Sequence, residues 1–261
     1  VIENGIVVMA DDGTIAAVGD ENTQIPSDAE VVDVSDRVVT PGLVESSTYL
    51  GLVEIWAVER SRDIDPGGDD PVRAAFRAAD AFNPDSTAIP ITRSGGVTSV
   101  IATPSGGLVS GRSAWADLGA PDAARPTHAT VSDQVVAMHI RYGVAGARAT
   151  GGSRGGAMEK LRELYDDVAF YRDNEDAYDQ NQARTLAASR LDLEALIPTL
   201  DGTLPVFISA HRASDITAAL EMASELGLDP VIVGGAEAWM VRDRLAEADV
   251  PVIVRPTSNL P

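Results

Sequence analysis

The last third of the chain alternates short apolar runs with helix-like segments, and this alternation limits the fold more than any other feature. The apolar runs cover 204–209, 230–234 and 250–254, and helical spacing of apolar residues covers 214–226 and 236–248. Ser214 is placed to cap the first helix and Gly227 to end it. Strands that are apolar throughout and joined by helices are typical of a parallel sheet covered by helices. The sequence therefore predicts an α/β fold.

The first forty residues have a different pattern. Strand-like runs at 5–9 and 14–19 flank a turn sequence ending in Gly13, which predicts a hairpin, and two more such runs follow at 30–34 and 37–40. Pro41 and Gly42 interrupt this pattern, and an apolar strand then begins. A β-rich head before such a break favours a (β/α)8-type TIM barrel, with a doubly wound open sheet as the alternative. We expect 1–40 to belong to a small β-sandwich and 41–261 to form the barrel.

The middle of the chain predicts further elements. Asp70 and Pro71 are placed to begin a helix over 70–79, a short helix at 89–94 ends at two glycines, and 97–102 is a buried strand. The glycine-rich segment 104–111 is expected to be a strand-to-helix turn, with an anion-binding loop as the weaker alternative. A long helix covers 158–180, with an apolar face made of Leu161, Leu164, Tyr165, Val168 and Tyr171.

Charge and composition exclude several function classes. Forty acidic and twenty basic residues give a formal charge of −20, which repels nucleic acids and anionic membrane surfaces. No cysteine is present, so thiolate nucleophiles, thiolate metal sites and disulfides are excluded. No apolar run is long enough for membrane insertion. A small molecule is therefore the expected partner, and a homo-oligomer is compatible with the composition.

Residues 41–54 carry the clearest likeness to a known family. They resemble the first barrel strand of the amidohydrolase superfamily, which reads Pro-Gly-Leu-Ile-Asp-x-His-x-His-x-Gly, but Ser47 and Tyr49 stand at the two histidine positions. The segment Arg93 to Thr98 resembles a second family element. The run from Thr48 to Glu54 is most similar to an imidazolonepropionase-like subgroup without the first-strand histidines.

The same resemblance locates two further strand ends. The segment 207–216 resembles a family element with two histidines, of which Ser209 replaces the first and His211 is the second. In 231–239, Gly234 stands where the family has a histidine. A hydrolytic zinc site needs about three fixed ligands and an open position. We therefore expect no metal at Ser47, Tyr49, Ser209 and Gly234, and zinc is implied as a cofactor by the resemblance alone.

The candidate site residues follow from these strand ends. His211 and Asp215 are the catalytic candidates, although a hydrogen-bonded core pair is an equal alternative. Glu54, Arg93, Arg212 and Glu237 are the candidate substrate-binding residues, with structural salt bridges as the alternative. Ser47, Tyr49 and His211 could also meet as a hydroxyl nucleophile with a base, which nothing in their spacing requires. His128 and His139 are expected to be structural.

The resemblance implies hydrolysis of C–N bonds in non-peptide or small amides, cyclic or linear. The replaced histidines support an alternative, an inactive pseudo-enzyme that binds a small molecule or serves in assembly. Full-length relatives are longer at both ends and often carry export signals. We therefore expect a fragment whose barrel is incomplete at its C-terminal end, and export to the periplasm is favoured over the cytoplasm.

Overall fold

The computed structural model describes residues 1–119 and 128–255, and the chain divides after Pro41 into two compact units. In the first unit, β1 (Ile6–Met9) and β2 (Ile15–Gly19) pair antiparallel, which confirms the predicted hairpin. The strands predicted at 30–34 and 37–40 do not form. Their valines stay exposed, because a two-stranded hairpin has no second layer against which they could pack. The composite β-sandwich stays a prediction.

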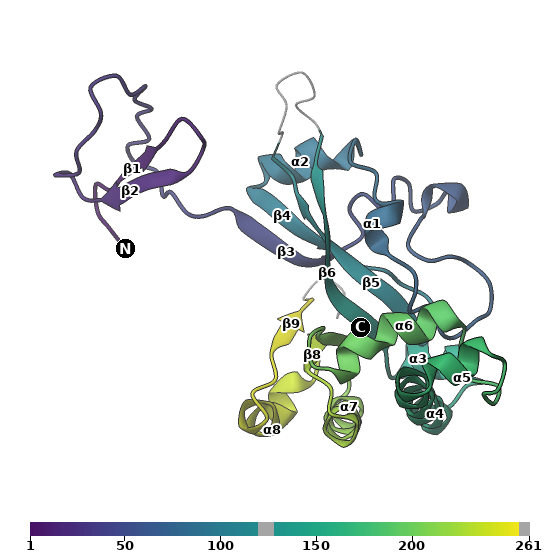
Figure 1. Cartoon of the computed structure of the whole chain (residues 1–261). Coiled ribbons are helices and arrows are strands. Elements are labelled where there is room, and N and C mark those ends of the chain that lie inside the picture. Colours follow the sequence, from purple (N-terminus) through teal and green to yellow (C-terminus); the bar gives the residue numbers. More distant parts are fainter. Residues whose placement is uncertain (120–127, 256–261) are drawn as a thin grey trace. The chain divides into compact units, whose positions relative to one another are not determined.

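The second unit contains one seven-stranded sheet (Figure 1). Its order follows the sequence: β3 (Leu43–Thr48), β4 (Val97–Ala102), β5 (Val109–Asp117), β6 (Thr130–Arg141), β7 (Val206–Ala210), β8 (Pro230–Gly234) and β9 (Val252–Val254). All of these strands run in one direction except β5, which is antiparallel to both of its neighbours. The sheet curves into a nearly closed, barrel-like shape, and β3 and β9 form its two edges. The predicted α/β class and barrel-like sheet are therefore present.

The helices lie between the strands of the sequence and cover the sheet (Figure 1). They are α1 (Ala78–Ala81), α2 (Ala88–Ser94), α3 (Val144–Ala149), α4 (Arg154–Asp173), α5 (Glu175–Asp179), α6 (Arg190–Leu200), α7 (Ala213–Leu226) and α8 (Arg242–Glu247), with short 3-10 turns at Glu59–Ser61 and Ala238–Val241. The long predicted helix is present as α4, which ends at Asp173 and does not continue to 180, and all five residues of its predicted apolar face are buried. Among the described residues, no helix is long and apolar enough to cross a membrane.

The predicted helix over 70–79 is wrong, because tertiary hydrogen bonds hold this segment in an extended conformation. The backbone N–H of Ala75 donates to the carboxylate of Asp192 in α6 at 2.8 Å, and the N–H of Arg73 donates to the carbonyl of Val109 in β5. These partners keep the segment extended along β5, so α1 is a single turn. Asp70 binds the N–H of Val72 instead of capping a helix. Hydrogen bonds to distant residues thus override a local helix signal.

Two other local predictions are also corrected. The glycine-rich segment 104–111 leads into the antiparallel strand β5, not into a helix. Gly106 and Gly107 adopt positive φ there, and a Cβ on Gly106 would lie 2.4 Å from Nη1 of Arg73. Ser214 does not cap α7; the helix begins at Ala213, whose N–H donates to the carboxylate of Glu237 at 2.8 Å. A side chain from the next βα loop thus replaces the local cap.

The two faces of the sheet have different neighbours. Met138 and Ile140 of β6 and Ile208 of β7 belong to the main core, which packs against α4, α6 and α7. Ala137 and Phe207, one residue away, belong to a smaller cluster on the opposite face. Side chains alternate between faces along a strand. His139, Arg141 and Ser209 therefore share the inner face with Ala137 and Phe207, away from the covering helices.

Candidate functional site

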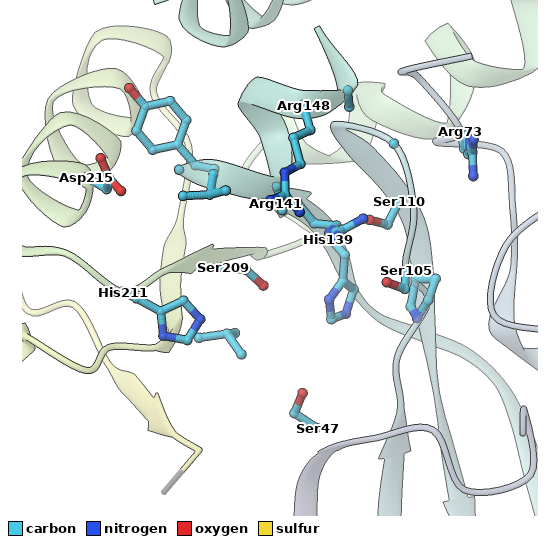
Figure 2. Close-up of a pocket in the computed structure, with 18 of the residues that line it drawn as sticks. Ser47, Arg73, Ser105, Ser110, His139, Arg141, Arg148, Ser209, His211 and Asp215 are labelled. Carbon is cyan, nitrogen blue, oxygen red and sulfur yellow. The ribbon is translucent and has the colours of Figure 1, made fainter. Parts of the chain in front are cut away.

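A cavity of about 790 Å³ opens at the carboxyl ends of the parallel strands (Figure 2). Ser47 reaches it from the end of β3, Arg141 from the end of β6, and Ser209 from β7. Loops beside the strands and the helices α3, α4 and α7 contribute further lining residues. Ligand sites of barrel-type α/β folds lie at this edge of the sheet. The cavity is therefore the candidate functional site.

Most of the residues predicted from the strand ends meet in this cavity. Ser47, Tyr49, Ser209, His211, Arg212 and Asp215 all line it. Gly234 lies beside His211, since a Cβ on this glycine would be 2.4 Å from Cε1 of the imidazole. Any larger side chain at position 234 would therefore displace His211 or move the backbone, which already has a φ of 97°.

Three of the predicted substrate-binding residues lie outside the lining and have structural contacts. Glu54 accepts hydrogen bonds from the side chains of Asn83 and Ser86. Arg93 donates to the carbonyl of Leu118. Glu237 holds the first N–H of α7. Each of these three residues therefore has at least one contact within the protein, and none of them lines the cavity.

Asp215 and His211 do not form the hydrogen-bonded core pair that was one of the two alternatives, because Asp215 has another partner. The carboxylate of Asp215 is buried and accepts a hydrogen bond of 2.6 Å from Nε of Arg154, the first residue of α4. This contact raises the pKa of Arg154. Burial, together with the nearby charge of Asp215, raises the pKa of Tyr142, so its hydroxyl stays protonated and can donate. Asp215 therefore anchors α4 and α7 to each other at the cavity wall.

His211 is exposed at the other side of the cavity. It follows β7 directly, and its carbonyl accepts a hydrogen bond from the N–H of Glu237, which fixes the backbone of the loop. Figure 2 shows His211 and Ser209 on one side and Ser47 on another. No described side chain is hydrogen-bonded to the imidazole, so both nitrogens are available to a ligand or a water molecule.

His139 lies on the inner face of β6 and is almost completely buried. Its ring makes an edge contact with Phe207 at a centroid distance of 5.3 Å, and its Nε2 atom has no hydrogen-bond partner among the described residues. Burial lowers the pKa of His139 from its usual 6.5 to about 3, so the ring is neutral in neutral solution. His139 is thus a buried strand residue, and its Nε2 atom is not satisfied by the described part of the protein.

Arginine dominates the charge of the lining. Six arginines line the cavity against three aspartates: Arg73, Arg141, Arg148, Arg154, Arg212 and Arg255 against Asp69, Asp70 and Asp215. Two of the arginines are occupied, because Arg73 pairs with Asp65 and Arg154 pairs with Asp215. Arg255 lies 5.9 Å above the ring of Tyr49. Within the described chain, Arg141, Arg148 and Arg212 form no ion pair with a carboxylate.

Arg141, Arg148 and Ser110 were not predicted as site residues. Ser110 and Arg141 lie in β5 and β6, which contain many small and polar residues, so neither strand stood out as a buried apolar run. Arg148 lies in α3, the short helix that follows β6. The signal available was the segment from His139 to Arg141, in which two polar side chains alternate with an apolar one. Such alternation indicates a strand with one polar face.

The donors present do not fit a zinc ion. Over residues 1–119 and 128–255, no three His, Asp or Glu side chains come together in a way that could hold a metal. Ser47, Tyr49 and Ser209 carry hydroxyl groups, and Gly234 has no side chain. Neutral hydroxyls are poor ligands for zinc, which prefers imidazole, thiolate or carboxylate. No chemical step is therefore assigned to a metal ion.

The fold and the site together define a barrel-like α/β protein with a cavity at its strand ends. No protein-family model and no curated protein matches the chain. Among solved structures, the chain is similar to the crystal structure of an amidohydrolase from Thermotoga maritima MSB8, with a TM-score of 0.80 and 28% sequence identity. The likeness covers 96% of this chain but 65% of the other, so this chain spans less than two thirds of that protein's length. It supports a relationship to the amidohydrolase superfamily.

Proposed function

We propose that this chain is an amidohydrolase-like protein that hydrolyses a C–N bond of a small amide or lactam in the cavity. The observation that carries the proposal is the position of the cavity at the carboxyl ends of the strands. This chain is also similar to a solved amidohydrolase over 96% of its own residues. The finer placement in an imidazolonepropionase-like subgroup, with an incomplete (β/α)8 barrel, is part of this proposal and rests on the sequence motifs.

The lining residues can supply the chemistry of such a reaction. In this proposal, His211 accepts a proton from a water molecule as its oxygen forms a bond to the amide carbon. The C–N bond then breaks, and the protonated imidazole returns the proton to the leaving nitrogen. An arginine beside the carbonyl stabilises the negative charge that develops on its oxygen. Asp215 and Arg154 act indirectly, because they hold α7 and α4 at the cavity wall.

A second candidate function is binding without turnover. The replacement of family histidines by Ser47, Tyr49, Ser209 and Gly234 favours it, since the usual activation of water by a metal needs these ligands. A pseudo-enzyme of this kind would keep the cavity as a small-molecule site. Ligand binding without product formation would distinguish it from the first candidate.

The test is amine release from lactams, N-acyl amino acids and dipeptides, followed by mass spectrometry. We expect turnover by the purified chain, and a loss of about 100-fold or more in kcat for His211→Ala, which is the usual contribution of a general base. His128→Ala is the matched control, because His128 pairs with Asp85 outside the cavity lining and should leave turnover unchanged. Full turnover by His211→Ala would overturn the role of His211, and no turnover by the wild type would favour the second candidate.

Elemental analysis of the same sample tests the assignment of a metal-free reaction. We expect no metal in a stoichiometric amount, because the donor set does not fit one. Stoichiometric metal whose removal abolishes turnover would contradict this part of the proposal.

A further inference from the structure

We infer that the cavity selects ligands that carry an oxyanion, either a carboxylate or a phosphate, and that Arg141 and Arg148 hold this group. The inference deepens the proposed function and rests on it, because both concern the same cavity. It concerns ligand binding, however, and can be measured whether or not the ligand is turned over.

The sign of the charge in the cavity lining is opposite to that of the protein as a whole. The chain as a whole carries a formal charge of −20, whereas six arginines and three aspartates give the cavity lining a net positive charge. A random distribution would instead give the lining an excess of carboxylates. A cleft whose sign opposes its surroundings concentrates ligands of the opposite charge. In a protein this acidic, an anion finds its most favourable position in the cavity.

Two neighbouring arginines of the lining form no ion pair with a described carboxylate. Arg141 ends β6 and Arg148 lies in α3, and neither pairs with a described carboxylate. Figure 2 shows both at the same end of the cavity, beside Ser110. Like charges that share a partly buried site repel each other, and an oxyanion between two guanidinium groups relieves the repulsion and satisfies their N–H donors.

Helix α3 packs closely on the end of β6, and this packing brings the two arginines together. Gly146 in α3 packs directly on the carbonyl of Arg141, since a Cβ at this position would lie 2.0 Å from that oxygen. Helix α3 begins at Val144, shortly after β6 ends, and its residue Arg148 lines the cavity. A contact this tight fixes the spacing between the helix and the strand end, which preorganises the two guanidinium groups.

The aspartates of the lining do not neutralise these two arginines. Asp215 is held by Arg154, and Asp69 and Asp70 are exposed residues of the loop before Arg73. The carboxylate of Asp70 accepts the N–H of Val72. Tyr142 and His139 also line the cavity, and both side chains are neutral hydrogen-bonding groups that tolerate an anion.

Calorimetric titration of the whole chain with succinate, inorganic phosphate and neutral succinamide tests the inference. We expect succinate or phosphate to bind at least ten times more tightly than succinamide, and the stronger of the two identifies the source of the oxyanion. Arg141→Gln with Arg148→Gln should weaken that binding at least tenfold. Arg148→Gln alone, at an exposed position, should weaken it severalfold even if the double variant is destabilised.

Arg162→Gln is the matched control, because Arg162 pairs with Glu225 outside the cavity lining and its loss should leave the affinity unchanged. Equal binding of succinamide, undiminished binding by the arginine variants, or no binding of either anion would overturn the inference. Anion binding by a protein that shows no amide hydrolysis would overturn the proposed function and leave this inference standing.

Discussion

His139 shows at the scale of one residue how burial sets chemistry. In the folded protein, burial lowers the pKa of His139 to about 3, so the imidazole stays neutral above that pH. In the unfolded chain the same imidazole takes up a proton near pH 6.5. The unfolded state therefore binds more protons than the folded state between these two values. The contribution to stability is complete above pH 6.5 and is lost as the pH falls toward 3.

The first prediction concerns this pH dependence. Between pH 7 and pH 5, His139 should account for a loss of about 2 kcal/mol in the free energy of unfolding. His139→Phe keeps an aromatic contact with Phe207 but cannot take up a proton, so its loss over this range should be smaller by that amount. Urea denaturation at both pH values measures the difference.

The control for this experiment is His128→Gln. His128 is partly exposed and pairs with Asp85, so its replacement should retain the extra loss of stability shown by the wild type. If His139→Phe and the wild type lose the same free energy between pH 7 and pH 5, the imidazole is not buried as described.

At the scale of the element, Asp192 connects helix α6 to the extended segment before α1. Its buried carboxylate accepts hydrogen bonds from the N–H of Ala75 and from the hydroxyl of Ser189, which joins the start of α6 to the extended segment before α1. Asp192→Ala should lower the free energy of unfolding by about 2 kcal/mol, because a buried N–H is left without an acceptor. Asp192→Asn should lose less, since its amide oxygen can still accept. Equal losses in the two variants, measured by urea denaturation at pH 7, would contradict this account.

Gly146 sets the position of α3. Gly146→Ala places a methyl group against the carbonyl of Arg141, so the helix must shift, and we expect a loss of about 1–3 kcal/mol in stability together with weaker anion binding. Gly155→Ala in α4 is the matched control: its Cβ would meet no atom within 4 Å, and alanine is the better helix former. Thermal unfolding and calorimetry measure both effects. Unchanged anion affinity in Gly146→Ala would show that the spacing of α3 is unimportant.

The sequence predicted those elements whose own residues determine them. The strands at 97–102, 206–210 and 230–234 are apolar runs bounded by turns, and α4 has a regular apolar face, so local pattern was sufficient. The segment 70–79 and the start of α7 depend on Asp192 and Glu237, which lie far along the chain. A local pattern cannot contain such partners.

The same distinction applies to the site. Ser47, Ser209 and His211 were placed together because parallel strands end at the same edge of a sheet, and all three line the cavity. Arg141 was missed because β6 lacks a continuous apolar run and its pairing with β5 depends on residues more than ten positions away. Arg148 was missed because it lies in α3, a helix of six residues that was not predicted. Their importance became visible only from the charge of the assembled lining.

At the scale of the whole molecule, a barrel-like sheet places a positively charged cavity in a strongly acidic chain. The chain has a formal charge of −20, while the cavity lining has the opposite sign. Salt should therefore weaken ligand binding, because it screens the partly exposed guanidinium groups.

The central claim is that this cavity both hydrolyses a small amide and prefers an acidic one. The most direct measurement compares kcat/KM for an N-acyl amino acid with kcat/KM for its neutral amide, in the wild type and in Arg141→Gln with Arg148→Gln. We predict a preference of at least tenfold for the acid in the wild type and its loss in the double variant. Equal values for the two substrates in the wild type, or a preference that survives in the double variant, would contradict the account.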